Sequence, residues 1–179
     1  RTFMIARANS LCRGYSGIKE ENLNIYLQMI NNHVYPVVPR KGSLGTSGDL
    51  GPLGCIAAVA IGEWKARFND QEMPGSEAMA AAGVSLMHLN AKEGLSLING
   101  TSGMVGLAST VVTEAITTLK TSDIIAAFSI ETLLGRVNPF DLRVHEQKFH
   151  PGQYATASNI SKLLCGSGMA IDEQELSLE

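Results

Sequence analysis

The sequence has few of the residues that form metal sites or disulfide frameworks. It contains three cysteines in 179 residues, Cys12, Cys55 and Cys165, with no Cys-x-x-Cys pair and no His–Cys cluster. This pattern argues against a zinc site. An odd cysteine count without a recognisable signal peptide is typical of reduced thiols. We therefore expect a cytoplasmic protein that binds no metal.

Charge is also sparse. Charged residues make up 17% of the chain, the formal net charge is −3, and there is no run of Lys or Arg. These features disfavour nucleic acid and anionic membrane surfaces as partners. We see no uninterrupted apolar run of the ~20 residues that a membrane span needs, so we expect no membrane contact. The 45% hydrophobic content instead indicates a packed globular chain.

Apolar residues recur at helical spacing along most of the chain, which predicts a mainly α-helical, all-α fold. A last helix is expected to begin after Pro151-Gly152 and to end near Cys165-Gly166, and only residues 34–38 could form a short strand. Each apolar stripe could equally be plain core packing. The stripes are Leu23, Tyr26, Leu27 and Ile30; Leu53, Ala57, Ala60 and Trp64; Val105, Ala108, Val112, Ala115, Ile116 and Leu119; and Ile124, Phe128 and Leu134.

A glycine-rich segment, residues 42–48, precedes the helix that we expect to carry Trp64. It lacks the Gly-Lys-Ser/Thr ending of a phosphate-binding loop. It also lacks the spacing of a serine nucleophile elbow, because Ser47 is followed directly by Gly48. It could simply be a turn that caps the helix, with Ser47 or Asp49 as the N-cap.

The same segment satisfies the requirements for backbone cyclisation. Ser47 has a β-hydroxyl that can be eliminated, Gly48 has an unhindered amide nitrogen, and Thr46 supplies a carbonyl carbon for that nitrogen to attack. Ring closure with loss of two waters would leave a methylidene-imidazolone, an electrophile at the former Ser47 Cβ. On spacing alone, the capping turn is the commoner explanation.

Residues 42–53, Gly-Ser-Leu-Gly-Thr-Ser-Gly-Asp-Leu-Gly-Pro-Leu, resemble the signature of the histidine and phenylalanine ammonia-lyase family. That family usually has Ala where this chain has Thr46, a change that leaves the ring chemistry possible. Three further segments match the family in order. They are Arg7-Ala8-Asn9-Ser10 with Gly14-Tyr15-Ser16-Gly17-Ile18, residues 92–101 with Asn99-Gly100-Thr101, and His150-Pro151-Gly152-Gln153.

Within the family, Thr46-Ser47-Gly48 together with residues 64–67 and 99–106 is most similar to bacterial phenylalanine 2,3-aminomutases. Histidine ammonia-lyases usually have Gln where this chain has Ser102, which disfavours a histidine substrate. The resemblance implies that residues 1–179 are a partial ammonia-lyase-like domain, the central helical part of a longer chain. The start at Arg1 and the acidic end at 172–179 agree with that expectation.

The resemblance also implies roles for single residues. Thr46, Ser47 and Gly48 would supply the 4-methylidene-imidazol-5-one prosthetic group, with Asp49 and a helix N-terminus beside it. Asn99 would be the active-site asparagine, although Asn-Gly before a helix at Ser102 could also be an ordinary capped turn. Apolar side chains at Leu50, Leu95 and Ile98 would line the substrate pocket, or could belong to the core.

The activity implied is that of an aromatic amino acid ammonia-lyase or 2,3-aminomutase, with phenylalanine as the substrate and a homotetramer as the working form. Histidine ammonia-lyase and a non-catalytic helical assembly module are the alternatives. The catalytic tyrosines and the carboxylate-binding arginine of the family fall outside these motifs, so we expect the isolated 179-residue chain to lack activity.

Overall fold

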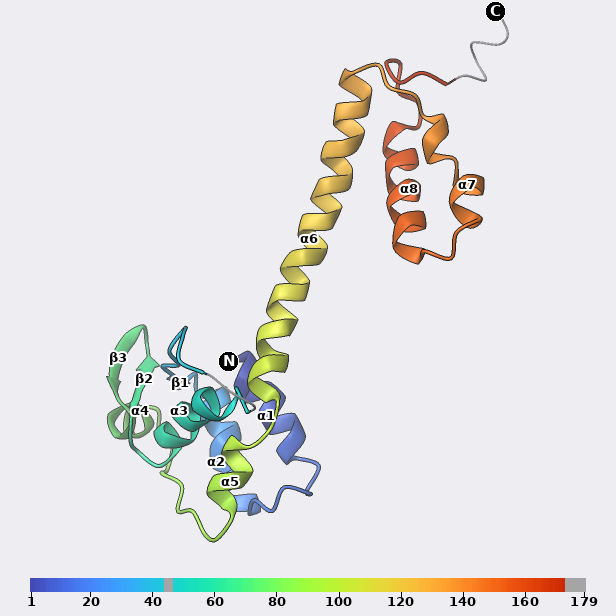
Figure 1. Cartoon of the computed structure of the whole chain (residues 1–179). Coiled ribbons are helices and arrows are strands. Elements are labelled where there is room, and N and C mark those ends of the chain that lie inside the picture. Colours follow the sequence, from blue (N-terminus) through green and yellow to red (C-terminus); the bar gives the residue numbers. More distant parts are fainter. Residues whose placement is uncertain (44–46, 173–179) are drawn as a thin grey trace, which may run out of the picture. The chain divides into compact units, whose positions relative to one another are not determined.

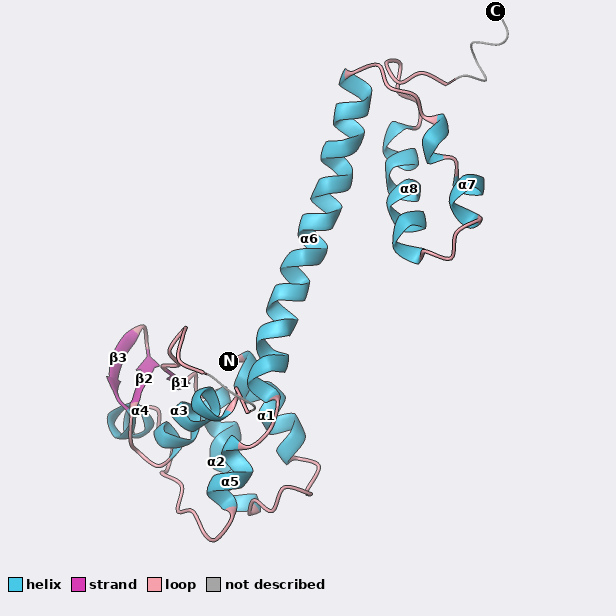
Figure 2. Ribbon diagram, in the orientation of Figure 1, coloured by secondary structure: helices cyan, strands magenta, loops and turns pink. Residues whose placement is uncertain are grey.

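The computed structural model describes residues 1–43 and 47–172, and they form a mainly α-helical structure, as predicted. The chain divides into two compact units, Arg1–Val111 and Val112–Glu179. Figures 1 and 2 show the elements of each unit, which are described separately below.

The first unit packs short helices around one core, with a small sheet beside them (Figure 2). The buried centre is formed by apolar side chains from α1, α2, α3 and α5, including Met4, Tyr26, Met29, Leu53 and Leu97. Its elements, in order, are α1 Thr2–Leu11, α2 Glu20–Asn31, β1 Tyr35–Pro36, α3 Leu50–Ala60, β2 Lys65–Phe68, β3 Gln71–Pro74, α4 Gly75–Ala81, α5 Glu93–Ile98 and the start of α6.

The predicted stripes explain two helices of the first unit, α2 and α3. In α2 the stripe buries Tyr26 and Ile30, and Glu20 and Glu21 lie in the first turn, where negative charge suits the helix dipole. In α3 Leu53 and Ala57 are buried as expected. The prediction that this helix carries Trp64 is wrong, because α3 ends at Ala60.

Trp64 instead lies directly before β2 in a three-stranded sheet. Strand β1, Tyr35–Pro36, confirms the possible strand at residues 34–38, whereas β2 and β3 were not predicted. Trp64 has φ 56° and donates from Nε1 to the Val37 carbonyl at 2.8 Å. Strands β1, β2 and β3 pair antiparallel in that order. Asn69 and Asp70 have φ values of 48° and 62°, which suits a two-residue turn between β2 and β3.

The third and fourth stripes belong to one helix, α6 Ser102–Thr132, which is 31 residues long. Leu134 lies beyond its end, at φ 53°. By length and composition alone, the segment Glu93–Thr132 would suit a membrane span, a feature that the sequence analysis overlooked. One such helix is weak evidence, since the core helix of a soluble protein passes the same test. The absence of membrane contact therefore stays a prediction.

The second unit contains the rest of α6, η1 Asn138–Phe140, α7 Leu142–Glu146 and α8 Pro151–Leu164. The predicted last helix is confirmed, with Pro151 in its first turn, where a missing N–H costs nothing. Ala127, Ile160 and Leu164 form the buried centre of this unit.

Candidate active site around Ser47–Asp49 and Asn99

Ser47 and Gly48 of the predicted cyclising triad lie in a turn directly before α3. Thr46 lies outside the described residues. Ser47 is exposed, and its carbonyl accepts a hydrogen bond from the Leu50 amide at 3.1 Å. Gly48 is half-buried and Asp49 is buried, so the turn goes from solvent into the protein within three residues.

Asp49 occupies the N-cap position of α3, but its side chain does not cap that helix. Both carboxylate oxygens instead accept from the Met104 amide, at 3.1 and 3.0 Å. Met104 is in the first turn of α6, whose free N–H groups and dipole favour a negative charge. A Cβ at Gly103 would lie 3.2 Å from the Asp49 Cγ, so glycine there lets the carboxylate approach. Asp49 thus joins the triad turn to the segment that follows Asn99.

Packing also joins these two segments, because α3 contacts α5, the helix that ends just before Asn99. The start of α5 is fixed by Glu93, which is 1% exposed. Its carboxylate accepts from the Lys19 amide at 2.8 Å, from the Asn90 amide at 2.7 Å, and from the side chains of Asn22 and Asn90.

The electrostatics of Glu93 follow from those contacts. Burial acts to raise the pKa of Glu93, but the hydrogen bonds from Lys19, Asn90 and Asn22 outweigh burial and lower the pKa to about 2. The carboxylate is therefore charged at neutral pH, and it holds α5 against the N-terminal end of α2 and the loop that precedes α5.

Asn99 is exposed and follows the last residue of α5. It lines a small polar hollow of about 170 Å³. Leu95, which is half-exposed, lines the same hollow. The other lining residues are Arg7, Ser16, Lys92 and Ser96.

Gly48 and Asp49 line a different cavity, of about 530 Å³. Phe3, Arg40 and Met104 are among its other lining residues. The described residues therefore place the triad turn and Asn99 beside two separate hollows of the same unit. Asp49 and the α3–α5 packing connect the segments that carry them.

The three apolar candidates differ in their surroundings. Leu50, at the start of α3, is 39% exposed and Leu95 is 50% exposed, so both side chains are accessible to a ligand. Ile98 is half-buried and packs against the main core. The role of all three in lining a substrate pocket stays a prediction.

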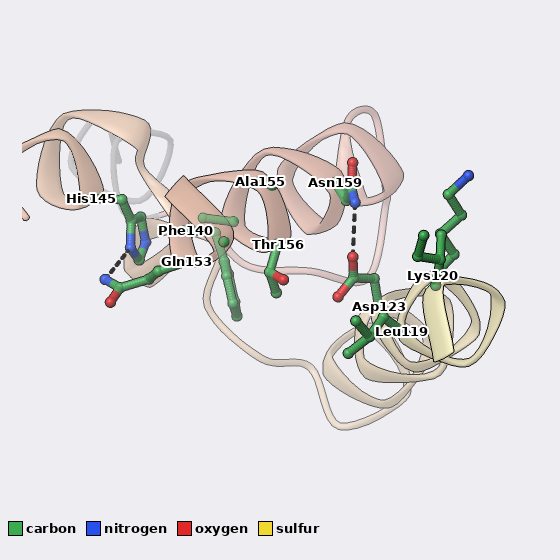
Figure 3. A pocket seen from close by; sticks show the side chains of 12 residues that line it. Leu119, Lys120, Asp123, Phe140, His145, Gln153, Ala155, Thr156 and Asn159 are labelled. Carbon is green, nitrogen blue, oxygen red and sulfur yellow. Dashed lines mark hydrogen bonds between the residues drawn. The ribbon is translucent and has the colours of Figure 1, made fainter. Parts of the chain in front are cut away.

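The His150–Gln153 motif lies in the second unit, beside a cavity of about 570 Å³ (Figure 3). Gln153 in α8 donates to Nδ1 of His145 at 2.9 Å, and Nε2 of the same ring donates to the Pro139 carbonyl at 2.9 Å. His145 thus ties η1, α7 and α8 together. Asp123 in α6 accepts from Asn159 in α8 at 2.8 Å on the other side of the cavity.

Two charged residues of the first unit, Arg7 and Glu93, had no predicted role. Both are almost fully buried. Each lies inside a segment that resembles the family, and no other feature of the sequence singled out either residue. Within residues 1–43 and 47–172, no group of three His, Cys, Asp or Glu side chains is placed to hold a metal ion.

Comparison with known proteins identifies the family. Residues 1–178 match the family model described as aromatic amino acid lyase. The chain belongs to the aromatic amino acid lyase family. A histidine ammonia-lyase of Alkaliphilus oremlandii is 46% identical over all 179 residues, which cover 35% of that protein.

Solved structures of the aromatic amino acid lyase family have the same fold. The phenylalanine aminomutase of Pantoea agglomerans matches 99% of this chain with a TM-score of 0.92 and 42% identity, over 34% of its own length. A tyrosine aminomutase from Streptomyces globisporus matches 99% of this chain with a TM-score of 0.89 and 34% identity, over 33% of its length. The chain thus spans about a third of these relatives.

Proposed function

We propose that the full-length protein eliminates the amine of an aromatic α-amino acid, as an ammonia-lyase or a 2,3-aminomutase, and that phenylalanine is its substrate. One observation supports this most. The Thr46-Ser47-Gly48 triad is intact in a member of the aromatic amino acid lyase family, and Asp49 ties its turn to the start of α6, just after Asn99.

The proposed prosthetic group, 4-methylidene-imidazol-5-one, would be made by Thr46, Ser47 and Gly48. The described part of the turn fits it. The bond from the Leu50 amide to the Ser47 carbonyl tightens the turn, Gly48 has no Cβ to hinder its nitrogen, and Ser47 is exposed. When formed, the group would supply an electrophilic carbon for the substrate amine.

The chain's own residues would bind and orient the substrate. Asn99 is exposed, and its side-chain amide can both donate and accept, so it suits a substrate's polar end. The accessible side chains of Leu50 and Leu95 would contact the aromatic ring, and Ile98, which packs against the core, would add to the apolar lining. Asp49 acts as a support, since its carboxylate is already used by Met104.

The proposed working form is a homotetramer. Along α6, large apolar side chains are exposed, including Val112, Ile116, Leu119, Ile125 and Phe128. Exposed apolar surface on this scale is typical of a subunit interface. Sedimentation of the full-length protein would test the proposal, and a stable monomer would contradict it.

The proposed activity is tested by incubating the full-length protein with L-phenylalanine, L-tyrosine and L-histidine. We expect turnover of phenylalanine, and no turnover of any of the three would refute the proposal. The Ser47→Ala variant separates an enzyme from an assembly module. It should keep the oligomer and lose all turnover, because its side chain has no hydroxyl to eliminate.

Histidine is the second candidate substrate, because the Alkaliphilus oremlandii relative is a histidine ammonia-lyase at 46% identity. The two products, urocanate and cinnamate, absorb differently and identify the substrate. If urocanate forms and cinnamate does not, the substrate is histidine and not phenylalanine, while the proposed reaction class, amine elimination, stands.

A further inference from the structure

Arg7 in α1 is a buried cation that the proposed chemistry does not use. It is 4% exposed, and among residues 1–43 and 47–172 no carboxylate pairs with it. Its Nε atom and the hydroxyl of Tyr26 are both buried without a hydrogen-bond partner. Burying a charge this way costs stability, so the core would be better served by an apolar side chain.

Two close contacts of Arg7 are with the turn that carries Asn99. Its Nη2 atom donates to the carbonyl of Ser96 in the last turn of α5. A Cβ on Gly100 would overlap the Nη1 atom, so the guanidinium lies directly against the residue that follows Asn99. Arg7 and Asn99 also line the same hollow.

The loop after α1 makes a second contact with the same helix. The Ser16 carbonyl accepts from the Ser96 hydroxyl and from Lys92 Nζ, the latter at 3.3 Å. Gly17 adopts φ +79°, a conformation that favours glycine, and a Cβ there would lie 3.4 Å from Lys92 Nζ. The two upstream motifs, Arg7–Ser10 and Gly14–Ile18, therefore both contact α5.

We propose that Arg7 is a positioning residue, which fixes the turn at residues 96–100 so that Asn99 is held in place for the reaction. The proposal rests on the proposed function, since Asn99 is placed in the active site there. Its physical basis is the fixed fork of guanidinium N–H groups, which can bind a carbonyl and fill the space under Gly100 at once.

A double-mutant cycle in the full-length protein tests this role. Arg7→Met should lower kcat about 100-fold, the loss that a misplacement of about 1 Å can cause, with a smaller change in KM. In an Asn99→Ala background the same change should cause little further loss, because Arg7 acts through Asn99. A purely structural residue would give equal losses in both backgrounds, and that result would overturn the proposal.

Hydrogen exchange provides a readout that needs no turnover. In Arg7→Met, amides of residues 97–101 should exchange faster while those of residues 65–74 stay unchanged. Arg13→Met, an exposed cation just past the end of α1, is the matched control and should change neither kcat nor exchange. Arg7→Lys keeps the charge but lacks the forked guanidinium, so its kcat and its exchange at residues 97–101 should lie between those of the wild type and Arg7→Met. This variant still tests the proposal if Arg7→Met does not fold.

The outcomes separate this proposal from the proposed function. Wild-type protein that turns over none of the three amino acids refutes the function, while exchange at residues 97–101 still decides whether Arg7 holds the turn. Active wild type with unchanged exchange in a folded Arg7→Met variant refutes the positioning role alone.

Discussion

Removing the Asp49 carboxylate should loosen the start of α6. The bond to Met104 has a charged acceptor, and such bonds contribute ~1.5–3 kcal/mol. The helix-dipole interaction adds ~0.3–1 kcal/mol. Allowing for non-additivity, we expect Asp49→Ala to lower the free energy of local opening by about 2 kcal/mol. At ~1.4 kcal/mol per tenfold change, this accelerates exchange of the Met104 amide roughly 30-fold.

The assay is hydrogen exchange of residues 103–107 in the full-length protein. Asp49→Asn keeps one acceptor oxygen without the charge, so it should lose about half as much free energy, ~1 kcal/mol. Glu114→Ala removes a charge from α6 well beyond its first turn and serves as the control, because the dipole effect is confined to the helix end. Unchanged Met104 exchange in Asp49→Ala would refute the argument that this carboxylate anchors α6.

Glu93→Gln should destabilise the protein by ~3 kcal/mol, since the Lys19 and Asn90 amides and the buried Asn22 side chain lose a charged acceptor. The pKa of Glu93 is about 2 in the folded protein and 4.5 ordinarily. Its carboxylate therefore contributes fully to the free energy of unfolding above pH ~4.5, and this contribution is lost as the pH falls towards 2. The stability measured by urea unfolding should accordingly fall less at acid pH in the variant than in the wild type. Gly106→Ala should cost ~1–3 kcal/mol in thermal unfolding, because its Cβ would lie 2.8 Å from the Phe3 amide nitrogen. Trp64→Phe should cost ~1 kcal/mol through the lost bond to Val37, measured by circular dichroism because the chain has one Trp.

The helices were predictable where an apolar stripe keeps one period. The stripe in α2 buries one face, and the apolar repeats at residues 105–128 predicted α6, which starts at Ser102 after the Asn-Gly turn signal. The β2–β3 hairpin was missed because its strands are short and expose alternating charged residues, with Ala66 as the buried apolar position of β2. Its sequence signal was the Asn69-Asp70 pair.

The site was only partly predictable for a different reason. Local pattern made cyclisation at Ser47 and Gly48 possible, and only the family resemblance marked Asn99 as a candidate. The bond that connects their segments joins residues 55 positions apart. Likewise, nothing in the spacing around Arg7 or Glu93 indicates that these charged side chains are buried. Burial and long-range hydrogen bonds depend on packing between helices, which a single sequence shows only through family resemblance.

The most direct test of the account is the intact mass of the full-length protein, with fragmentation across residues 44–50. The account predicts a deficit of two waters located at Thr46-Ser47-Gly48, and its absence in Ser47→Ala. An unmodified mass in the full-length wild-type protein would contradict the account, because the proposed electrophile would not exist.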